Sequence, residues 1–165
     1  MEVITTPLEA FSLARDGLVL DFGLGALPWD LAESRTCRLD ALSELHPGQV
    51  FTCAAAAWIH TGVGRFAIPH VAVRGSRSCL HRVGHRWRLG EDELLRRGSA
   101  ACTDPLRTLL DLLISCPVEP DVLLSLTYVA RREHSAVEWR ERFVADHRGT
   151  VDTYLRLRRL YELSS

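Results

Sequence analysis

Apolar side chains recur at helical spacing through much of the second half of the chain. The clearest stripe lies on a predicted helix that begins at Asp104-Pro105, after Thr103, a residue suited to capping a helix N-terminus. Prolines and further cap residues separate this helix from others, which the pattern predicts over about 120–132, 135–147 and 150–163. We therefore expect the C-terminal half to be helical.

Helical signals also occur in the first half of the chain. A helix is predicted from Thr6-Pro7 to near Gly17, and another over about 34–46. A short apolar strand, Leu18-Val19-Leu20, is expected between them. Thr52 is a good N-cap for a further helix, from Cys53 to His60, whose run of alanines permits close packing.

The middle of the chain alternates between apolar and polar positions, as strands do. This alternation predicts one strand from Ile68 to Val73 and a second from Cys79 to Leu89, with a turn at Gly75-Ser76-Arg77-Ser78. A short β segment is predicted near Ala100-Ala101-Cys102. Together these elements predict an α+β fold, in which a small antiparallel sheet is flanked by helices and the C-terminal half is helical.

The chain has 165 residues, of which 47% are hydrophobic, and this suffices for one ordinary domain with its own core. We expect residues 1–165 to form a single domain, with a helical lead-in over 1–46 and the main part over 47–165. No apolar run approaches the length of a membrane span. The five cysteines are odd in number and widely spaced, which predicts a reduced, cytoplasmic protein.

The positive charge is concentrated in one segment. The net charge is −1 and every one of the 20 basic residues is arginine, yet residues 65–90 contain six arginines and no acid. A two-stranded ribbon with arginines along one face could lie on a phosphate backbone. Alternatively, these arginines pair with acids of flanking helices, such as Asp104 or Glu119. The candidate residues for binding DNA, RNA or another anion are Arg65, Arg74, Arg77, Arg82, Arg86 and Arg88.

Other groups of reactive residues do not support catalysis or metal binding. Cys79, His81 and His85 share one face of a predicted strand, but no two cysteines have the short spacing typical of a zinc site. The sequence contains no nucleophile elbow, zinc-deaminase signature or phosphate-binding glycine loop. The acids Glu91-Asp92-Glu93 are expected in a solvated turn. We therefore predict no enzyme, no catalytic residue, no metal and no cofactor.

One pair of opposite charges is expected within the first helix of the C-terminal half. Arg107 and Asp111 are four residues apart, a spacing that brings their side chains together on a helix. A pair on the helix surface would contribute about 0.3–0.5 kcal/mol. We interpret this pair as a structural link.

Two stretches of the sequence resemble the C-terminal, antitoxin domain of the AbiEi-type antitoxins and transcriptional regulators. The segment from Pro47 to Gly62 is similar to that family's alanine-rich entry, whose pattern is met here by Thr52, Ala55, Ala56, His60 and Gly62, with Ile59 in place of a leucine. The segment from Cys102 to Leu112 resembles its "threonine, x, proline, x, arginine-threonine-x-x-aspartate-leucine" helix, through Thr103, Arg107, Thr108 and Asp111. The resemblance covers about residues 38–160.

This resemblance implies an antitoxin or transcription regulator of a bacterial phage-defence locus. In the family, a winged helix-turn-helix at the N-terminus binds DNA, and the C-terminal domain opposes a nucleotidyltransferase-like toxin. Residues 1–46 of this chain are too short for a convincing winged helix, and the chain ends before the nuclease that some relatives carry. The domain resembled is therefore the antitoxin part alone.

We thus expect a non-enzymatic, antitoxin-like or regulator-like protein of a bacterial toxin–antitoxin system, with an arginine-rich ribbon for nucleic acid or an acidic partner. A protein–protein adaptor with no nucleic-acid role, its arginines in internal salt bridges, is the alternative. A remnant enzyme is a third hypothesis. The expected partners are DNA or RNA at residues 65–90, or a nucleotidyltransferase-like toxin or other protein, and no membrane.

Overall fold

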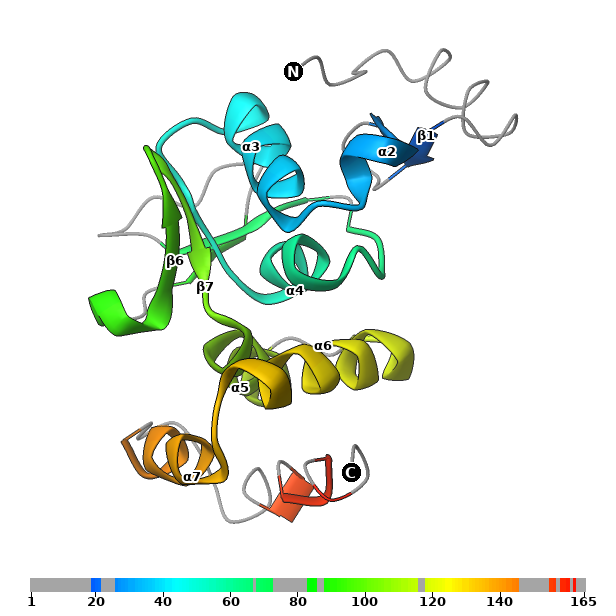
Figure 1. Cartoon of the computed structure of the whole chain (residues 1–165). Coiled ribbons are helices and arrows are strands. Elements are labelled where there is room, and N and C mark those ends of the chain that lie inside the picture. Colours follow the sequence, from blue (N-terminus) through cyan, green and yellow to red (C-terminus); the bar gives the residue numbers. More distant parts are fainter. Residues whose placement is uncertain are drawn as a thin grey trace.

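A computed structural model gives the fold of most of the chain (Figure 1). It describes residues 19–21, 26–66, 68–72, 83–85, 88–115, 118–145, 155–156, 158–160 and 162. The helix predicted from Thr6 to Gly17 lies outside these residues. In the described part no helix is long and apolar enough to cross a membrane.

The centre of the fold is a five-stranded sheet with the strand order β5-β4-β3-β7-β6. Its strands, in that order, are Val83–His85, His70–Ala72, Val50–Phe51, Ala100–Thr103 and Leu94–Arg97. The α+β class and the helical C-terminal half are confirmed. The sheet is mixed rather than antiparallel, however, because β3 pairs with β7, and β4 with β5, in parallel.

The parallel pairing of β4 with β5 corrects the prediction of a hairpin ribbon. The glycine and serines at 75–78 have the composition of a tight turn, and a tight turn would make the strands antiparallel. Parallel neighbours need a longer connection, since the chain must return to the starting end of the first strand. Turn composition therefore indicates the break between the strands but not their relative direction.

Local signals predict most of the described helices, although not the short helix over Trp29–Ala32. Residues with helical periodicity lie between cap or proline positions close to those predicted. Ser135, for example, caps the helix after it, because the amide of Glu138 donates to its Oγ and the Glu138 carboxylate accepts from the amide of Ser135. The helices are α2 (Trp29–Ala32), α3 (Arg35–Leu45), α4 (Cys53–Thr61), α5 (Pro105–Ser115), α6 (Pro120–Glu133) and α7 (Ala136–Ala145).

A smaller pair of strands lies near the beginning of the described chain. Strands β1 (Val19–Asp21) and β2 (Ala26–Pro28) are antiparallel, and Leu20 lies opposite Leu27. The apolar strand predicted at 18–20 corresponds to β1, whereas the sequence pattern does not predict β2. Helical residues also occur between 155 and 162, within the last predicted helix.

Helix α4 lies between α3 on one side and the pair α5 and α6 on the other (Figure 1). It is buried on both sides, so it belongs to two hydrophobic clusters. Trp58 and Ile59 pack with Leu39, Leu42 and residues of the sheet. Cys53 and Ala57 pack with the leucines of α5 and α6 and with Trp139. Small side chains make this possible, because they let helices approach closely on both faces.

The C-terminal end of α4 is closed by Gly62 and Arg38. Gly62 has a φ of +71°, the left-handed conformation that glycine adopts most easily at helix ends. The buried guanidinium of Arg38 donates to the carbonyls of Ile59, at 2.8 Å, and His60, at 3.3 Å. Burial, with a smaller effect of nearby Arg35, lowers the pKa of Arg38 to about 10. These bonds tie α3 to the end of α4, and residues 26–46 contribute side chains to the core.

Candidate functional site

The described part of the basic segment places two of its six arginines on the surface. Arg65 and Arg88 are exposed. Arg65 lines a pocket of about 670 Å³, together with Phe66, His70 and Glu119. The other four candidate residues, Arg74, Arg77, Arg82 and Arg86, lie outside the described residues, as do Cys79 and His81.

Asp104, one of the acids expected to pair with these arginines, has other partners. It lies 3.5 Å from Arg142 and 3.7 Å from His134, and one of its oxygens accepts from the amide of Arg107 at 2.8 Å. That last bond makes Asp104 the residue that caps α5, which corrects the prediction of Thr103. A carboxylate satisfies the free amides of a helix N-terminus and also favours its positive end.

Thr103 instead forms part of a buried threonine pair. Its hydroxyl oxygen lies 2.7 Å from that of Thr108, and the Thr108 hydroxyl is also 2.7 Å from the Asp104 carbonyl. Both threonines are fully buried. Each hydroxyl therefore finds a partner inside the protein, as a buried polar group requires. This arrangement fixes the end of β7 to the first turn of α5.

The pair Arg107 and Asp111 is buried, contrary to the prediction of a surface pair. Their side chains are 6% and 0% exposed, and Arg107 Nε donates to Asp111 Oδ1 at 2.9 Å. A second bond runs from Arg107 Nη1 to Glu93 Oε1 at 2.6 Å. The spacing in the sequence reveals the pair, but burial depends on what the remainder of the chain places over α5.

Glu93 extends this network to the C-terminal helices. It belongs to a short 3₁₀ turn, η1 (Glu91–Glu93), and its side chain is only 17% exposed. Arg142 of α7 lies 3.3 Å from Glu93 and 3.1 Å from Asp92. The turn predicted as solvated thus holds one acid that joins α5 to α7.

His60 connects the two stretches that resemble the AbiEi-type family. Its Nε2 lies 2.7 Å from the carbonyl oxygen of Thr103, which can only accept, so Nε2 carries the proton. Burial lowers the pKa of His60 to about 4. Cys102 lies beside it, and burial raises the pKa of that thiol to about 12, which keeps it protonated and unreactive.

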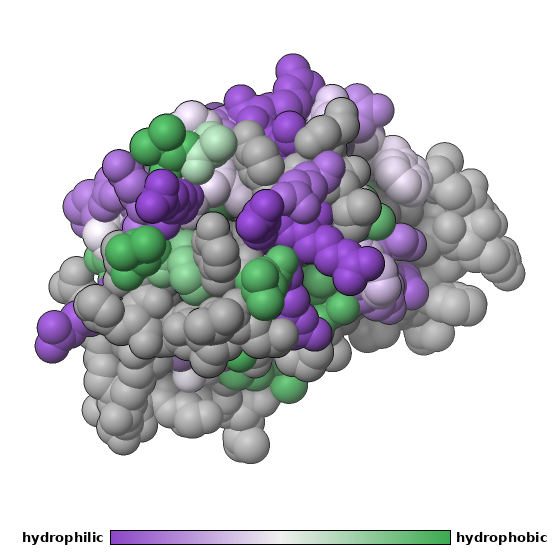
Figure 2. Space-filling model, turned by 90° about the horizontal axis from the view of Figure 1, so that it is seen from below, coloured by the Kyte–Doolittle hydropathy of each residue, from purple (hydrophilic) through white to green (hydrophobic). Residues whose placement is uncertain are grey.

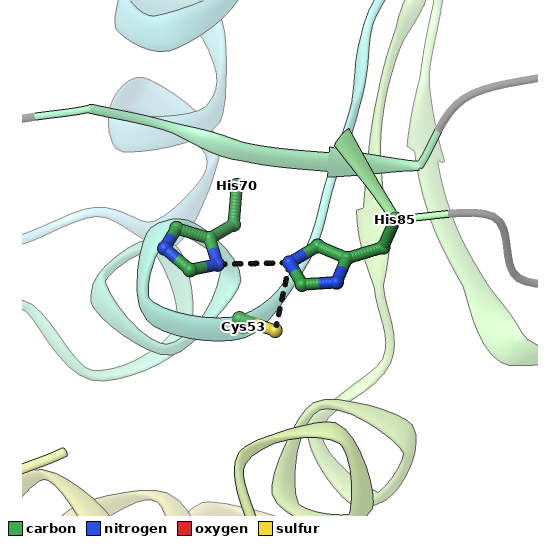
Figure 3. Close-up of side chains that lie close together, drawn as sticks. All are labelled: Cys53, His70 and His85. Atoms are coloured by element: carbon green, nitrogen blue, oxygen red, sulfur yellow. Dashed lines mark hydrogen bonds between the residues drawn. The ribbon is translucent and has the colours of Figure 1, made fainter. Parts of the chain in front are cut away.

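A cluster that the sequence does not predict lies at the other end of α4 (Figure 3). Cys53 begins the helix, His70 comes from β4 and His85 from β5. His85 Nε2 is 3.0 Å from His70 Nδ1 and 3.8 Å from Cys53 Sγ. The two rings stack with their centroids 5.1 Å apart. Cys53 is fully buried, whereas both histidines are half-buried.

The backbone of Cys53 is unusual. Its φ is +48°, and among the described residues no other non-glycine residue has a positive φ. Such a conformation costs free energy for a residue with a side chain, and it recurs where a side chain must be aimed at a functional site.

The strand pattern groups His85 with Cys79 and His81, whereas its partners here come from other elements. Among the described elements, the partners of His85 could be recognised from the sequence only if the parallel pairing of β4 with β5 were known.

Neither the family models nor the curated proteins with which the sequence was compared give a match.

Proposed function

We propose that this protein is a non-enzymatic, antitoxin-like or regulator-like domain of a bacterial toxin–antitoxin system, which acts by binding. One observation carries the proposal. The two stretches that resemble the AbiEi-type antitoxin domain meet in space, through the bond from His60 to the Thr103 carbonyl at 2.7 Å. A buried polar contact between residues 43 positions apart is what we expect of two stretches that specify one fold together.

The contacts of the motif residues where the two stretches meet support a role in binding rather than in catalysis. Arg107, Thr108 and Asp111 are buried and bond with each other or with their neighbours. Catalytic groups must reach a substrate, normally in a pocket. These motif residues therefore serve the fold, and recognition is left to surface groups. The basic segment over residues 65–90, of which Arg65 and Arg88 are described and exposed, has the charge that suits nucleic acid or an acidic protein.

Fluorescence anisotropy of labelled duplex DNA from the protein's own promoter, titrated across salt, tests this proposal. If the basic segment neutralises four phosphates, the slope of log K against log salt should be about −3.6. Replacing Arg82, Arg86 and Arg88 with alanine should flatten the slope by about 0.9 for each phosphate that is no longer neutralised. Arg140→Ala, which removes one exposed arginine of α7 outside the segment, is the matched control for Arg88→Ala alone, which removes one exposed arginine inside it.

Binding that is equally weakened by the control would point to net charge rather than to the segment. Absence of DNA and RNA binding at low salt would reject the nucleic-acid part of the proposal. The antitoxin part has its own test, which is growth rescue on co-expression with a nucleotidyltransferase-like toxin encoded beside the gene. Failure of rescue with a toxin that is active alone would reject it.

The adaptor hypothesis has an observation in its favour. On the face that carries the C-terminal helices, apolar residues form separate patches among hydrophilic ones (Figure 2). Val137 and Val144 of α7 are 63% and 70% exposed. If this hypothesis is right, Val137→Ser with Val144→Ser should abolish capture of a protein partner, and the wild type should bind no nucleic acid.

A further inference from the structure

We propose that Cys53, His70 and His85 form a binding site for one transition-metal ion, with Zn²⁺ the best match. The three donor atoms all lie within 4.8 Å of one another. A thiolate sulfur and two imidazole nitrogens are the ligands that zinc takes most often in proteins. His70 and His85 lie within residues 65–90, but the inference does not rest on the proposed function, since it uses their ring nitrogens and the Cys53 sulfur and none of the arginines.

Two of the three distances between the donor atoms are close to those around a tetrahedral ion. With bonds of about 2.05 Å to nitrogen and 2.3 Å to sulfur, a tetrahedron has edges of about 3.3 Å between nitrogens and about 3.6 Å between nitrogen and sulfur. The corresponding distances here are 3.0 Å and 3.8 Å. The remaining edge, from Cys53 to His70, is at most 4.8 Å and needs to close by about 1 Å.

The fold aims these side chains at one point. Ala72 lies opposite His85 in the parallel pair of β4 and β5. Because side chains alternate along a strand, His70 projects from the same face as Ala72, and therefore from the same face as His85. Both rings point toward the beginning of α4, where the Cys53 side chain meets them (Figure 3).

Two features of Cys53 suit it to a ligand role. Its φ of +48° directs the side chain in a way that an ordinary first helical residue does not share. It also stands at the positive end of α4, which favours a negatively charged sulfur. A packing role alone, as a small apolar residue in the core beside Ala57, would require neither feature.

The described residues supply three of the four ligands that a tetrahedral ion takes. His70 also lines the pocket that contains Arg65. An ion held by His70 would therefore lie next to a concave surface open to small molecules.

The test is a metal titration of the whole 165-residue chain after chelator treatment. Zn²⁺ affinity is measured by competition with a chromogenic chelator, and Co²⁺ provides the spectroscopic signature. We expect one equivalent of metal and a thiolate-to-cobalt charge-transfer band. Cys53→Ser should abolish that band and weaken Zn²⁺ binding at least tenfold. His85→Asn, at a half-buried position, should weaken binding by a similar factor.

A matched control comes from the buried contact between Cys102 and His60, whose Sγ and Nε2 lie 3.9 Å apart. This contact resembles that of Cys53 with His85, but the Nε2 proton of His60 already bonds to the Thr103 carbonyl. Cys102→Ser should therefore keep the Co²⁺ band. Circular dichroism verifies that each variant is folded, and His85→Asn serves if Cys53→Ser unfolds. Metal binding that is absent in the wild type, or unchanged in folded Cys53→Ser or His85→Asn, would overturn the proposal.

Discussion

At the scale of single residues, His60 shows how burial sets a charge. The folded protein keeps this imidazole neutral down to a pKa of about 4, whereas the unfolded chain protonates it near 6.5. Between those two values the unfolded state binds the extra proton, so the free energy of unfolding should fall as the pH falls. The expected loss from this group is at most roughly 3 kcal/mol and is complete near pH 4.

Urea unfolding of wild type and His60→Gln at about pH 7 and about pH 4.5 measures this effect. Glutamine has a donor for the Thr103 carbonyl but does not titrate, so the variant should lose less stability on acidification. His46→Gln controls for the loss of a histidine at a half-buried position. An identical pH dependence for His60→Gln and wild type would contradict the assignment.

Alanine substitutions at two glycines with nearly the same φ can distinguish the cost of backbone strain from the cost of side-chain crowding. Gly48 has a φ of +70° and nothing near the position of an added Cβ, whereas Gly62, at +71°, would bring its Cβ to 3.2 Å from Nη1 of Arg38. Gly48→Ala should cost about 1–2 kcal/mol, the usual penalty of a left-handed conformation. Gly62→Ala should cost more, because Arg38 must move away from the carbonyls it bonds. Calorimetric melting of both variants gives the comparison, and equal costs would mean that Arg38 yields freely.

At the scale of elements, α5 contains the ion pair of Arg107 and Asp111, whose contribution to the free energy of unfolding depends on its burial. Asp111→Asn should destabilise the protein by about 3 kcal/mol, since it removes the charge of one of the two acids described beside the buried guanidinium of Arg107. The pair Arg158 and Glu162 has the same four-residue spacing but is exposed. Glu162→Gln should therefore cost less than about 0.5 kcal/mol. Chemical denaturation of both variants tests the contrast, which fails if the two costs are alike.

The elements also show what sequence can reveal. Helices α3 to α7 are predictable because caps, prolines and apolar spacing are local signals. The direction of β5 relative to β4 is not, because it depends on the path between strands. The pair of Arg107 and Asp111 can be found by its spacing, because both residues lie on one helix. Cys53, His70 and His85 come from three elements, so the sequence does not show that they form one cluster. Only the folded sheet brings those three together.

At the scale of the whole molecule, α4 makes the two hydrophobic clusters depend on each other. Trp58 lies in the cluster with the sheet, and Trp139 lies in the cluster with α5 and α6. Since α4 contributes side chains to both, loss of either cluster should unfold the other. The test uses two variants, one that retains only Trp58 and one that retains only Trp139. In each variant, the urea midpoint measured by fluorescence should equal the midpoint that the same variant gives by circular dichroism. Two separate midpoints within one variant would reveal two folding units.

Strand β3 has a consequence for the rate of folding. It contains two residues, yet it occupies the middle of the sheet, where Val50 pairs with Ala72 on one side and Ala101 on the other. The pairing of β3 with β7 closes a loop of about fifty residues. The entropy of that loop is lost before the hydrogen bonds between the two strands can compensate for it. Helices α5 and α6 need only neighbouring contacts and can associate first. We therefore expect the slow step in reaching the native state to be the arrival of this two-residue strand between its neighbours.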